Sequence, residues 1–175
     1  MSELSRADIV RLLEALERKL AEQSVTGELY LVGGAVMCLV FQERPSTKDV
    51  DGYFAPKETV RAAARAVGVE LGFGENWLND AVKGFLSERG TYTPFFDLPH
   101  LKVFTADPAY LLAMKCLSLR LGPLFRDEED VRFLLRYLNI ETLEEALAIL
   151  GKYYPLERYP PKTRYILTDL LGSTS

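Results

Sequence analysis

Two aspartates, Asp49 and Asp51, flank a single apolar residue in the segment whose composition is best suited to chemistry. The segment is typical of a short strand, and side chains two residues apart on a strand point to the same face. Adjacent carboxylates repel each other, so in water-poor surroundings one is protonated or both bind a divalent cation. Such oxygen ligands hold Mg²⁺ against substrate phosphates. The pair therefore suggests a metal site, although a solvated strand edge has the same pattern.

A pair of glycines precedes these aspartates. Gly33 and Gly34 follow a short apolar strand and precede a segment of helical character. Because glycine lacks Cβ, the backbone can approach a ligand closely there, and amides at a helix start can bind phosphate oxygens. An isolated Gly-Gly also fits a tight strand-to-helix turn. The order of the segments favours the ligand-binding interpretation of Gly33-Gly34, because a loop with Arg44 and Lys48 follows and leads to the strand with the aspartates.

This order resembles the polymerase-β-type nucleotidyltransferase superfamily. There, a strand ending in Gly-Gly or Gly-Ser is followed by a helix and by a strand with two acids separated by one apolar residue. The resemblance implies that Gly33 and Gly34 shape a triphosphate pocket, that Lys48 neutralises phosphate charge, and that Asp49 and Asp51 bind Mg²⁺. The matching residues are Leu31-Val32-Gly33-Gly34-Ala35-Val36-Met37 and Thr47-Lys48-Asp49-Val50-Asp51.

A second group of charged residues lies in the C-terminal part. Lys115 interrupts an otherwise apolar helix, and Asp127 and Asp130 lie on the apolar stripe of the next predicted helix. Carboxylates that face the interior need partners, and Lys115, Arg120 or Arg126 are suitable. A structural ion-pair network between two helices explains the pattern without any function.

The same residues are similar to a lysine motif followed by Arg-Asp-x-x-Asp in minimal nucleotidyltransferases of prokaryotic toxin-antitoxin and abortive-infection systems, the AbiEii-like group. This resemblance covers about residues 28 to 138. It implies that Lys115 and either Asp127 or Asp130 are needed for catalysis. A closer likeness, which includes Trp77-Leu78-Asn79-Asp80, is to uncharacterised nucleotidyltransferase-like bacterial proteins related to that group.

Enzymes of the polymerase-β type usually place a third carboxylate on a neighbouring strand, where it helps to activate the attacking hydroxyl. Asp97, before an apolar run at 101–104, is our first candidate for this catalytic role, and Asp80 is the second. Both also fit ordinary loop acids. Some minimal members of the family manage without a third carboxylate.

Aromatic residues offer weaker indications of binding. Trp77, Asn79 and Asp80 could line a base or acceptor pocket, although a lone Trp is more often partly buried packing. The segment 152–165 interleaves Tyr with Lys and Arg, as an RNA-binding surface would, but a strap with packed tyrosines is the simpler interpretation.

The composition of the chain limits which kinds of protein these motifs can belong to. The 175 residues are 48% hydrophobic with a formal net charge of -4, which fits one domain of ordinary size and argues against broad nonspecific binding of nucleic acid. The single His argues against a metal site or a catalytic triad built on histidine. Cys38 and Cys116 form no paired cysteine motif. No apolar run is long enough for a membrane span, and the N-terminus lacks a signal-peptide pattern, so we expect a cytoplasmic protein with no membrane partner.

Periodicity predicts an α+β fold with a small mixed sheet of the nucleotidyltransferase type and flanking helices, in a single domain over 1–175. The sheet core is expected at 28–105 and a helical part at 106–175. Gly and Pro signals place the ends of most elements. The predicted helices are 5–27, 35–41, 56–67, 107–121, 126–138, 142–150 and a last one ending near 172, and the predicted strands are 28–32, 49–54 and two or three between 69 and 105.

The leading functional hypothesis is a Mg²⁺-dependent nucleotidyltransferase that transfers an NMP from an NTP to a hydroxyl acceptor. The resemblance implies tRNA or protein as acceptor, a toxin role, and an antitoxin protein as partner. The alternatives are a noncatalytic nucleotidyltransferase-like module that binds a nucleotide or a protein, and a structural interaction domain in which the aspartates are surface residues.

Overall fold

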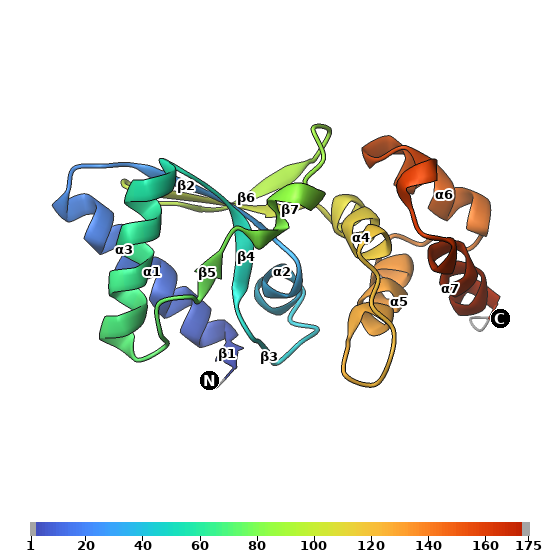
Figure 1. The fold of residues 1–175 in the computed structure, drawn as a ribbon, viewed down its shortest axis with the longest axis horizontal. Helices are drawn as coiled ribbons and strands as arrows, with labels where there is room; N and C mark the ends of the chain where they lie inside the picture. Colours follow the sequence, from blue (N-terminus) through green and yellow to red (C-terminus); the bar gives the residue numbers. More distant parts are fainter. Residues whose placement is uncertain (1–2, 173–175) are drawn as a thin grey trace. The chain divides into compact units, whose positions relative to one another are not determined.

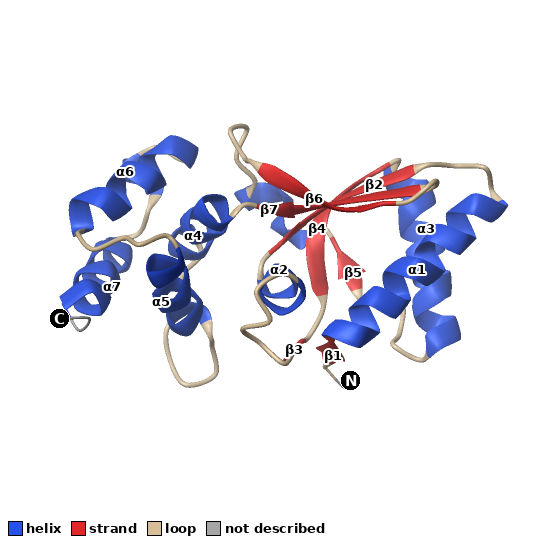
Figure 2. Cartoon of the chain, turned by 180° about the vertical axis from the view of Figure 1, so that it is seen from behind, coloured by secondary structure: helices blue, strands red, loops and turns tan. Residues whose placement is uncertain are grey.

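The computed structural model describes residues 3–172 and has the mixed α+β architecture that the sequence predicts (Figure 1, Figure 2). The chain divides into two compact units. Unit 1 consists of Met1–Gly84 and Tyr92–Ala106 and contains the main sheet, whereas unit 2 consists of Phe85–Thr91 and Asp107–Ser175 and is mainly helical. None of the helices in this part of the chain has the length and apolar content needed to span a bilayer.

Unit 1 is built on a mixed five-stranded sheet with the strand order β5-β4-β2-β7-β6. The central strand β2 pairs antiparallel with β4 and parallel with β7, while β5 is parallel to β4 and β6 is antiparallel to β7. A separate pair, β1 and β3, lies near the N-terminus. The strands are β1 (Leu4–Ser5), β2 (Gly27–Val32), β3 (Ser46–Thr47), β4 (Val50–Ala55), β5 (Leu78–Asn79), β6 (Tyr92–Asp97) and β7 (Leu101–Ala106).

The helices α1 (Arg6–Glu22) and α3 (Lys57–Leu71) cover one face of this sheet (Figure 1). A Cβ at Gly27 of β2 would contact Leu20 of α1 and Val60 of α3, so the strand lies directly beneath both helices. Alternate residues of β2 and β7 are buried, as expected when one face of a sheet is covered. The predicted capping box of α1 is present, since Ser5 and Asp8 exchange hydrogen bonds.

The helix α3 extends past Gly68, where we expected it to end. A Cβ on Gly68 would lie 1.9 Å from the backbone oxygen of Gly74 and 2.5 Å from the Trp77 ring, so this glycine allows the chain to return closely over the helix. The helix ends instead at Gly72, whose φ of 83° is the left-handed conformation typical of a glycine C-cap. Gly68 is therefore a packing position within the helix.

Unit 2 contains four α-helices among the described residues, coloured yellow to red in Figure 1. The first begins at Pro108 with Asp107 as N-cap residue, as predicted, but it ends at Leu117, before the expected Gly122-Pro123. A Thr142 side chain caps the third helix by accepting a hydrogen bond from the Glu145 amide. The helices are α4 (Pro108–Leu117), α5 (Asp127–Tyr137), α6 (Leu143–Tyr153) and α7 (Pro161–Gly172).

Candidate functional site

The two aspartates lie where β4 begins, beside the end of β2. The antiparallel register pairs Asp51 with Val32, the last residue of β2, so Asp51 is adjacent to the turn that starts at Gly33. Asp49 directly precedes β4, and both aspartates are half-buried. The sheet thus brings together the two motifs that the sequence separates by a helix and a loop.

Asn79 on the neighbouring strand β5 joins this pair. The parallel register places Asn79 beside Asp51, so their side chains share a face of the sheet. Its Nδ2 donates a hydrogen bond of 2.9 Å to Oδ2 of Asp49. We define the carboxylate site as Asp49, Asp51 and Asn79. The sequence pointed to Asn79 only as a possible pocket residue, because the pairing of so short a strand is not visible in the sequence.

The Gly33-Gly34 turn lies against the carboxylate site. Gly33 has φ of 69°, in the region that favours glycine, and a Cβ there would stand 3.5 Å from Oδ2 of Asp51. A Cβ on Gly34 would lie 2.7 Å from Nη1 of Arg44 and 3.0 Å from Oγ1 of Thr47. The turn therefore holds one carboxylate and one guanidinium close to its backbone.

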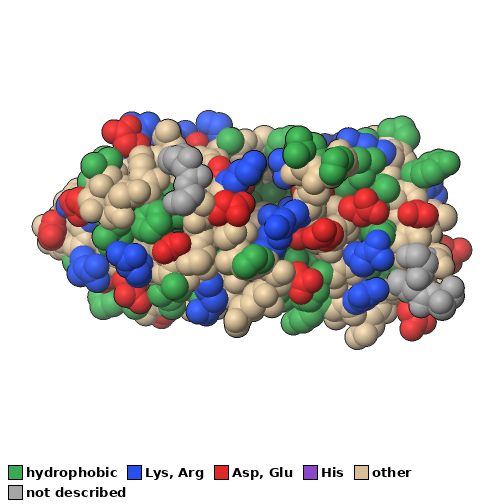
Figure 3. All heavy atoms as spheres, turned by 90° about the horizontal axis from the view of Figure 1, so that it is seen from below, with side chains coloured by type: hydrophobic (Ala, Val, Ile, Leu, Met, Phe, Trp, Pro, Cys, Tyr) green, Lys and Arg blue, Asp and Glu red, His purple; other side chains and the backbone are tan. Residues whose placement is uncertain are grey.

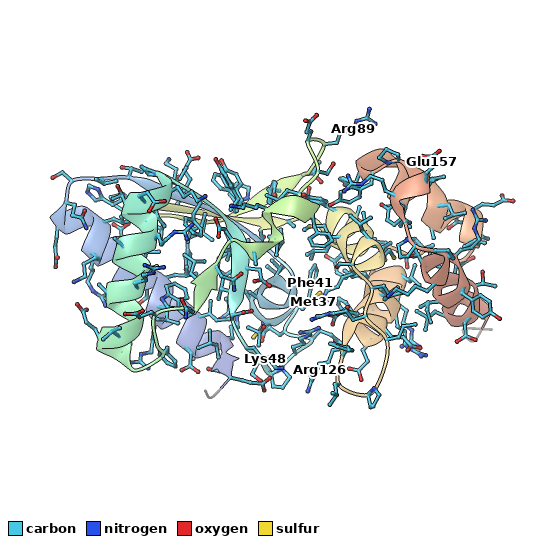
Figure 4. The ribbon with its side chains drawn as sticks, in the orientation of Figure 1. Met37, Phe41, Lys48, Arg89, Arg126 and Glu157 are labelled. Carbon is cyan, nitrogen blue, oxygen red and sulfur yellow. The ribbon has the colours of Figure 1, made fainter. Side chains whose placement is uncertain are left out.

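Arg44 is a site residue that sequence reasoning noted only as part of a loop. The absence of a side chain at Gly34 is what makes room for its guanidinium. Lys48, the predicted phosphate-binding residue, is exposed in the loop between β3 and β4 (Figure 4). Arg44 precedes β3, and of these two cations it is the one placed against the glycine turn.

The composition of the carboxylate site suits Mg²⁺ more than a metal that needs a complete protein shell. The described residues contain no group of three or more His, Cys, Asp or Glu side chains arranged to hold a metal ion. Mg²⁺ is commonly bound by one or two carboxylates while water and substrate phosphates complete its octahedral shell. Asp49 and Asp51 fit that role, with Asn79 fixing the carboxylate of Asp49.

The structure does not bring Asp97 to the carboxylate site. Asp97 pairs with Lys102 across β6 and β7, and Lys102 pairs with Glu28 near the start of β2. Asp51 pairs instead with Val32, four residues along β2, which is about 13 Å at the rise of an extended strand. Lys102 Nζ lies 3.1 Å from the Asp97 carboxylate. Our expectation that Asp97 completes a carboxylate triad is therefore wrong for this fold, because the register places it at the opposite end.

The second candidate, Asp80, interacts with the helix α3. Its Oδ2 lies 3.0 Å from Nη2 of Arg61 and 3.6 Å from Nζ of Lys57. Burial alone would raise the pKa of Asp80, but the charges of these cations bring it below its ordinary value. Asp80 thus ties the segment after β5 to α3.

Trp77 is part of the core and not of a pocket. Its side chain is 1% exposed, and its Nε1 donates a hydrogen bond of 2.7 Å to the backbone oxygen of Ala64 in α3. The packing interpretation of this residue agrees with its position.

A separate group of charged residues lies in unit 2. We define the buried ion cluster as Lys115, Arg120, Asp127 and Asp130. Lys115 Nζ lies 3.4 Å from Oδ1 of Asp127 and 2.9 Å from Oδ2 of Asp130. Arg120 donates from Nε and Nη2 to Asp127, at 3.0 and 3.1 Å, and its amide donates at 2.8 Å. Both aspartates are 1% exposed.

The cluster fixes the protonation of its central carboxylate. Burial alone would raise the pKa of Asp127, but the hydrogen bonds from Arg120 and the charge of Lys115 bring it below its ordinary value. Two carboxylates facing two cations in a buried setting form a compensated ion-pair network that connects α4 with the start of α5. This arrangement agrees with a structural ion-pair network between two helices, and the catalytic role of these residues stays a prediction.

The aromatic residues of the C-terminal segment are mostly packed. Tyr153 stacks on Tyr110 with ring centroids 5.1 Å apart, and the Tyr159 hydroxyl donates to the backbone oxygen of Leu150 at 2.8 Å. Arg158 lies over the ring of Tyr154. Figure 3, which views the molecule from below, shows positive and negative side chains interspersed on that face. The segment 152–165 therefore agrees with the interpretation of a strap with packed tyrosines.

Comparisons of the chain with protein-family models, with curated proteins and with solved structures found no match.

Proposed function

We propose that this protein is a Mg²⁺-dependent nucleotidyltransferase that transfers an NMP from an NTP to an acceptor hydroxyl. One observation carries the proposal: Asp49, Asp51 and Asn79 share a sheet face directly beside a glycine turn against which Arg44 lies. Carboxylates, a close backbone and a guanidinium are the groups that bind a metal-complexed triphosphate.

Each residue has a distinct part in the proposed site. Asp49 and Asp51 would hold Mg²⁺, and Asn79 orients the carboxylate of Asp49 through its hydrogen bond. Gly33 and Gly34 allow phosphate oxygens to approach the backbone. Arg44, which lies against Gly34, would neutralise phosphate charge, and the exposed Lys48 could add to it.

The proposed reaction is an in-line displacement. The acceptor oxygen forms a bond to the α-phosphorus, the bond from that phosphorus to the bridging oxygen of the β-phosphate breaks, and pyrophosphate leaves while the hydroxyl proton passes to solvent. Bound Mg²⁺ would supply charge neutralisation for the phosphates. The protein contributes mainly by positioning and by fixed electrostatics. Acceptors suggested by the family resemblance are tRNA and protein hydroxyls, and the same resemblance suggests a cytoplasmic toxin controlled by an antitoxin protein.

A second candidate is a noncatalytic module that binds a nucleotide or a protein. The positions of the two candidate acids favour it, because Asp97 lies at the opposite end of the sheet and the carboxylate of Asp80 is paired with Arg61 of α3. A module that binds a nucleotide shares the phosphate-binding step with the enzyme and differs from it only in transfer, whereas a module that binds a protein lacks both.

The test is to incubate the full chain with Mg²⁺ and each α-labelled NTP, with total tRNA or cell extract as acceptor. We expect label transfer that is lost in the Asp49→Ala, Asp51→Ala double variant. Asp97→Ala is the matched control, since it removes an acid from the same sheet at the opposite end, and it should retain transfer. Metal-dependent NTP binding without transfer would select the noncatalytic module. Absence of both binding and transfer would reject the nucleotide hypothesis.

A further inference from the structure

The sheet face that carries Asp51 also carries a group of aromatic side chains. Tyr30 of β2 pairs with Tyr53 of β4 on one side and with Phe104 of β7 on the other, so the three rings form a row across the sheet. They lie on the face opposite the buried residues that contact α1 and α3. We define the aromatic row as Tyr53, Tyr30 and Phe104.

Contacts with neighbouring side chains hold the central ring of the aromatic row, Tyr30, in place. The rings of Tyr30 and Phe104 are stacked, with centroids 4.9 Å apart and an interplanar angle of 10°. Tyr92 contacts Tyr30 edge-on at 5.2 Å, and the Tyr30 hydroxyl donates a hydrogen bond of 2.9 Å to Glu28. Tyr30 is therefore held from three directions.

Tyr53 is the accessible end of the row. Its ring centroid is 6.1 Å from that of Tyr30, and the residue is 47% exposed. A ring supported on one side and open on the other can stack on a planar ligand with little loss of conformational freedom. Tyr53 also follows Asp51 by two residues in β4, so both side chains point to the same face, about 7 Å apart along the strand.

We propose that Tyr53 is the base-stacking residue of this site, on which the nucleobase of a nucleoside triphosphate lies while its phosphates extend toward Asp51. The inference rests on the proposed function for the phosphate end of the ligand. Stacking uses the π-face that every nucleobase has, so Tyr53 would contribute affinity for all four NTPs.

The charges around the aromatic row favour a single nucleotide over a polynucleotide strand. Glu28 and Asp97 lie beside the row, and Lys102 is already paired with Asp97. A strand that crossed the row would bring its phosphates toward these carboxylates, whereas a mononucleotide places its phosphates only at the carboxylate site. The ligand class that fits is therefore the nucleoside triphosphate itself.

The experiment measures binding by calorimetry of the full chain in Mg²⁺, with two probes: α,β-methylene ATP, which has a base but cannot transfer its NMP, and inorganic tripolyphosphate, which has no base. Tyr53→Ala should weaken binding of the ATP analogue roughly 5- to 150-fold and leave tripolyphosphate binding unchanged. Tyr53→Phe keeps the ring and should bind both probes like the wild type.

Two further variants separate stacking from other effects. Tyr53→Leu keeps an apolar side chain without a π-face and should bind the analogue more weakly than Tyr53→Phe does, even if Tyr53→Ala folds poorly. Tyr165→Ala removes a tyrosine that is 79% exposed in α7 and should have no effect on either probe.

The outcomes distinguish this inference from the proposed function. If Tyr53→Leu and Tyr53→Ala bind the analogue as tightly as the wild type, the stacking role is wrong while the carboxylate site stands. If the wild type binds neither probe in Mg²⁺, the proposed function fails first, and the role of Tyr53 fails with it.

Discussion

The carboxylate site of unit 1 and the buried ion cluster of unit 2 both contain two closely spaced aspartates, yet their surroundings differ. Asp127 and Asp130 are 1% exposed, and two cationic side chains contact them. Asp49 and Asp51 are half-buried and lie beside a glycine turn, with an amide donor at Asp49. The comparison shows that two acid pairs can differ in burial and in partners, and on this difference we base the proposal that one pair stabilises the fold and the other binds a ligand.

The largest effect that would test this contrast is expected at the buried ion cluster. Lys115→Met leaves two buried carboxylates with one cation fewer, and removing one partner of a buried ion pair commonly costs about 3–5 kcal/mol. We expect a loss of that order in the free energy of unfolding, measured by urea denaturation monitored through far-UV circular dichroism.

Lys19→Met is the control for Lys115→Met. It breaks the exposed pair with Glu70, for which we expect a loss of less than about 1 kcal/mol. A Lys115→Met protein that keeps its stability and loses nucleotide transfer would contradict the structural role and support the catalytic role that the family resemblance implies.

An intermediate effect is expected at the glycine turn. Gly34→Ala would place a Cβ 2.7 Å from Nη1 of Arg44, so the guanidinium must move away from the turn. Because a charged hydrogen bond to phosphate contributes about 1.5–3 kcal/mol, we expect Mg²⁺-ATP to bind about tenfold or more weakly.

Calorimetric titration with α,β-methylene ATP measures this change. Gly84→Ala is the matched control, since a Cβ there has open space around it, and it should bind like the wild type. Equal affinity of Gly34→Ala and wild type would show that Arg44 is not needed at the turn.

The smallest effect concerns acid stability. Since the pKa of Asp127 in the folded protein lies below its ordinary value near 3.8, this carboxylate contributes stability that is fully present above that value. The contribution is lost as the pH falls from about 4 through the lowered pKa. We expect the free energy of unfolding of the wild type to decrease over this range.

The measurement is urea denaturation at pH 6 and at steps down to pH 3. Asp127→Asn should be less stable than the wild type at pH 6 and should show a shallower decrease on acidification, because the titrating group is absent. Parallel pH profiles for the two proteins would exclude Asp127 as the source.

Several elements could be predicted from the sequence because local rules determine them. The stripe of Ile9, Leu12, Leu13, Leu16 and Leu20 is buried as its helical spacing predicts, and the Ser5 cap forms as expected. Alternating burial in β2 likewise follows from its residues. The boundary at Gly68 was misplaced, because the reason for that glycine is a close contact with Gly74 and Trp77 from outside the helix.

The sequence by itself determined which residues could form the carboxylate site, since strand periodicity places Asp49 and Asp51 on one face and the preceding Gly33-Gly34 marks a turn. Only the tertiary structure decided what accompanies them. Register across the sheet brings Asn79 to Asp49 and keeps Asp97 at the opposite end, and the space above Gly34 admits Arg44. The physical reason is that periodicity encodes the direction of a side chain within one element, whereas neighbours across elements depend on pairing and packing between distant segments.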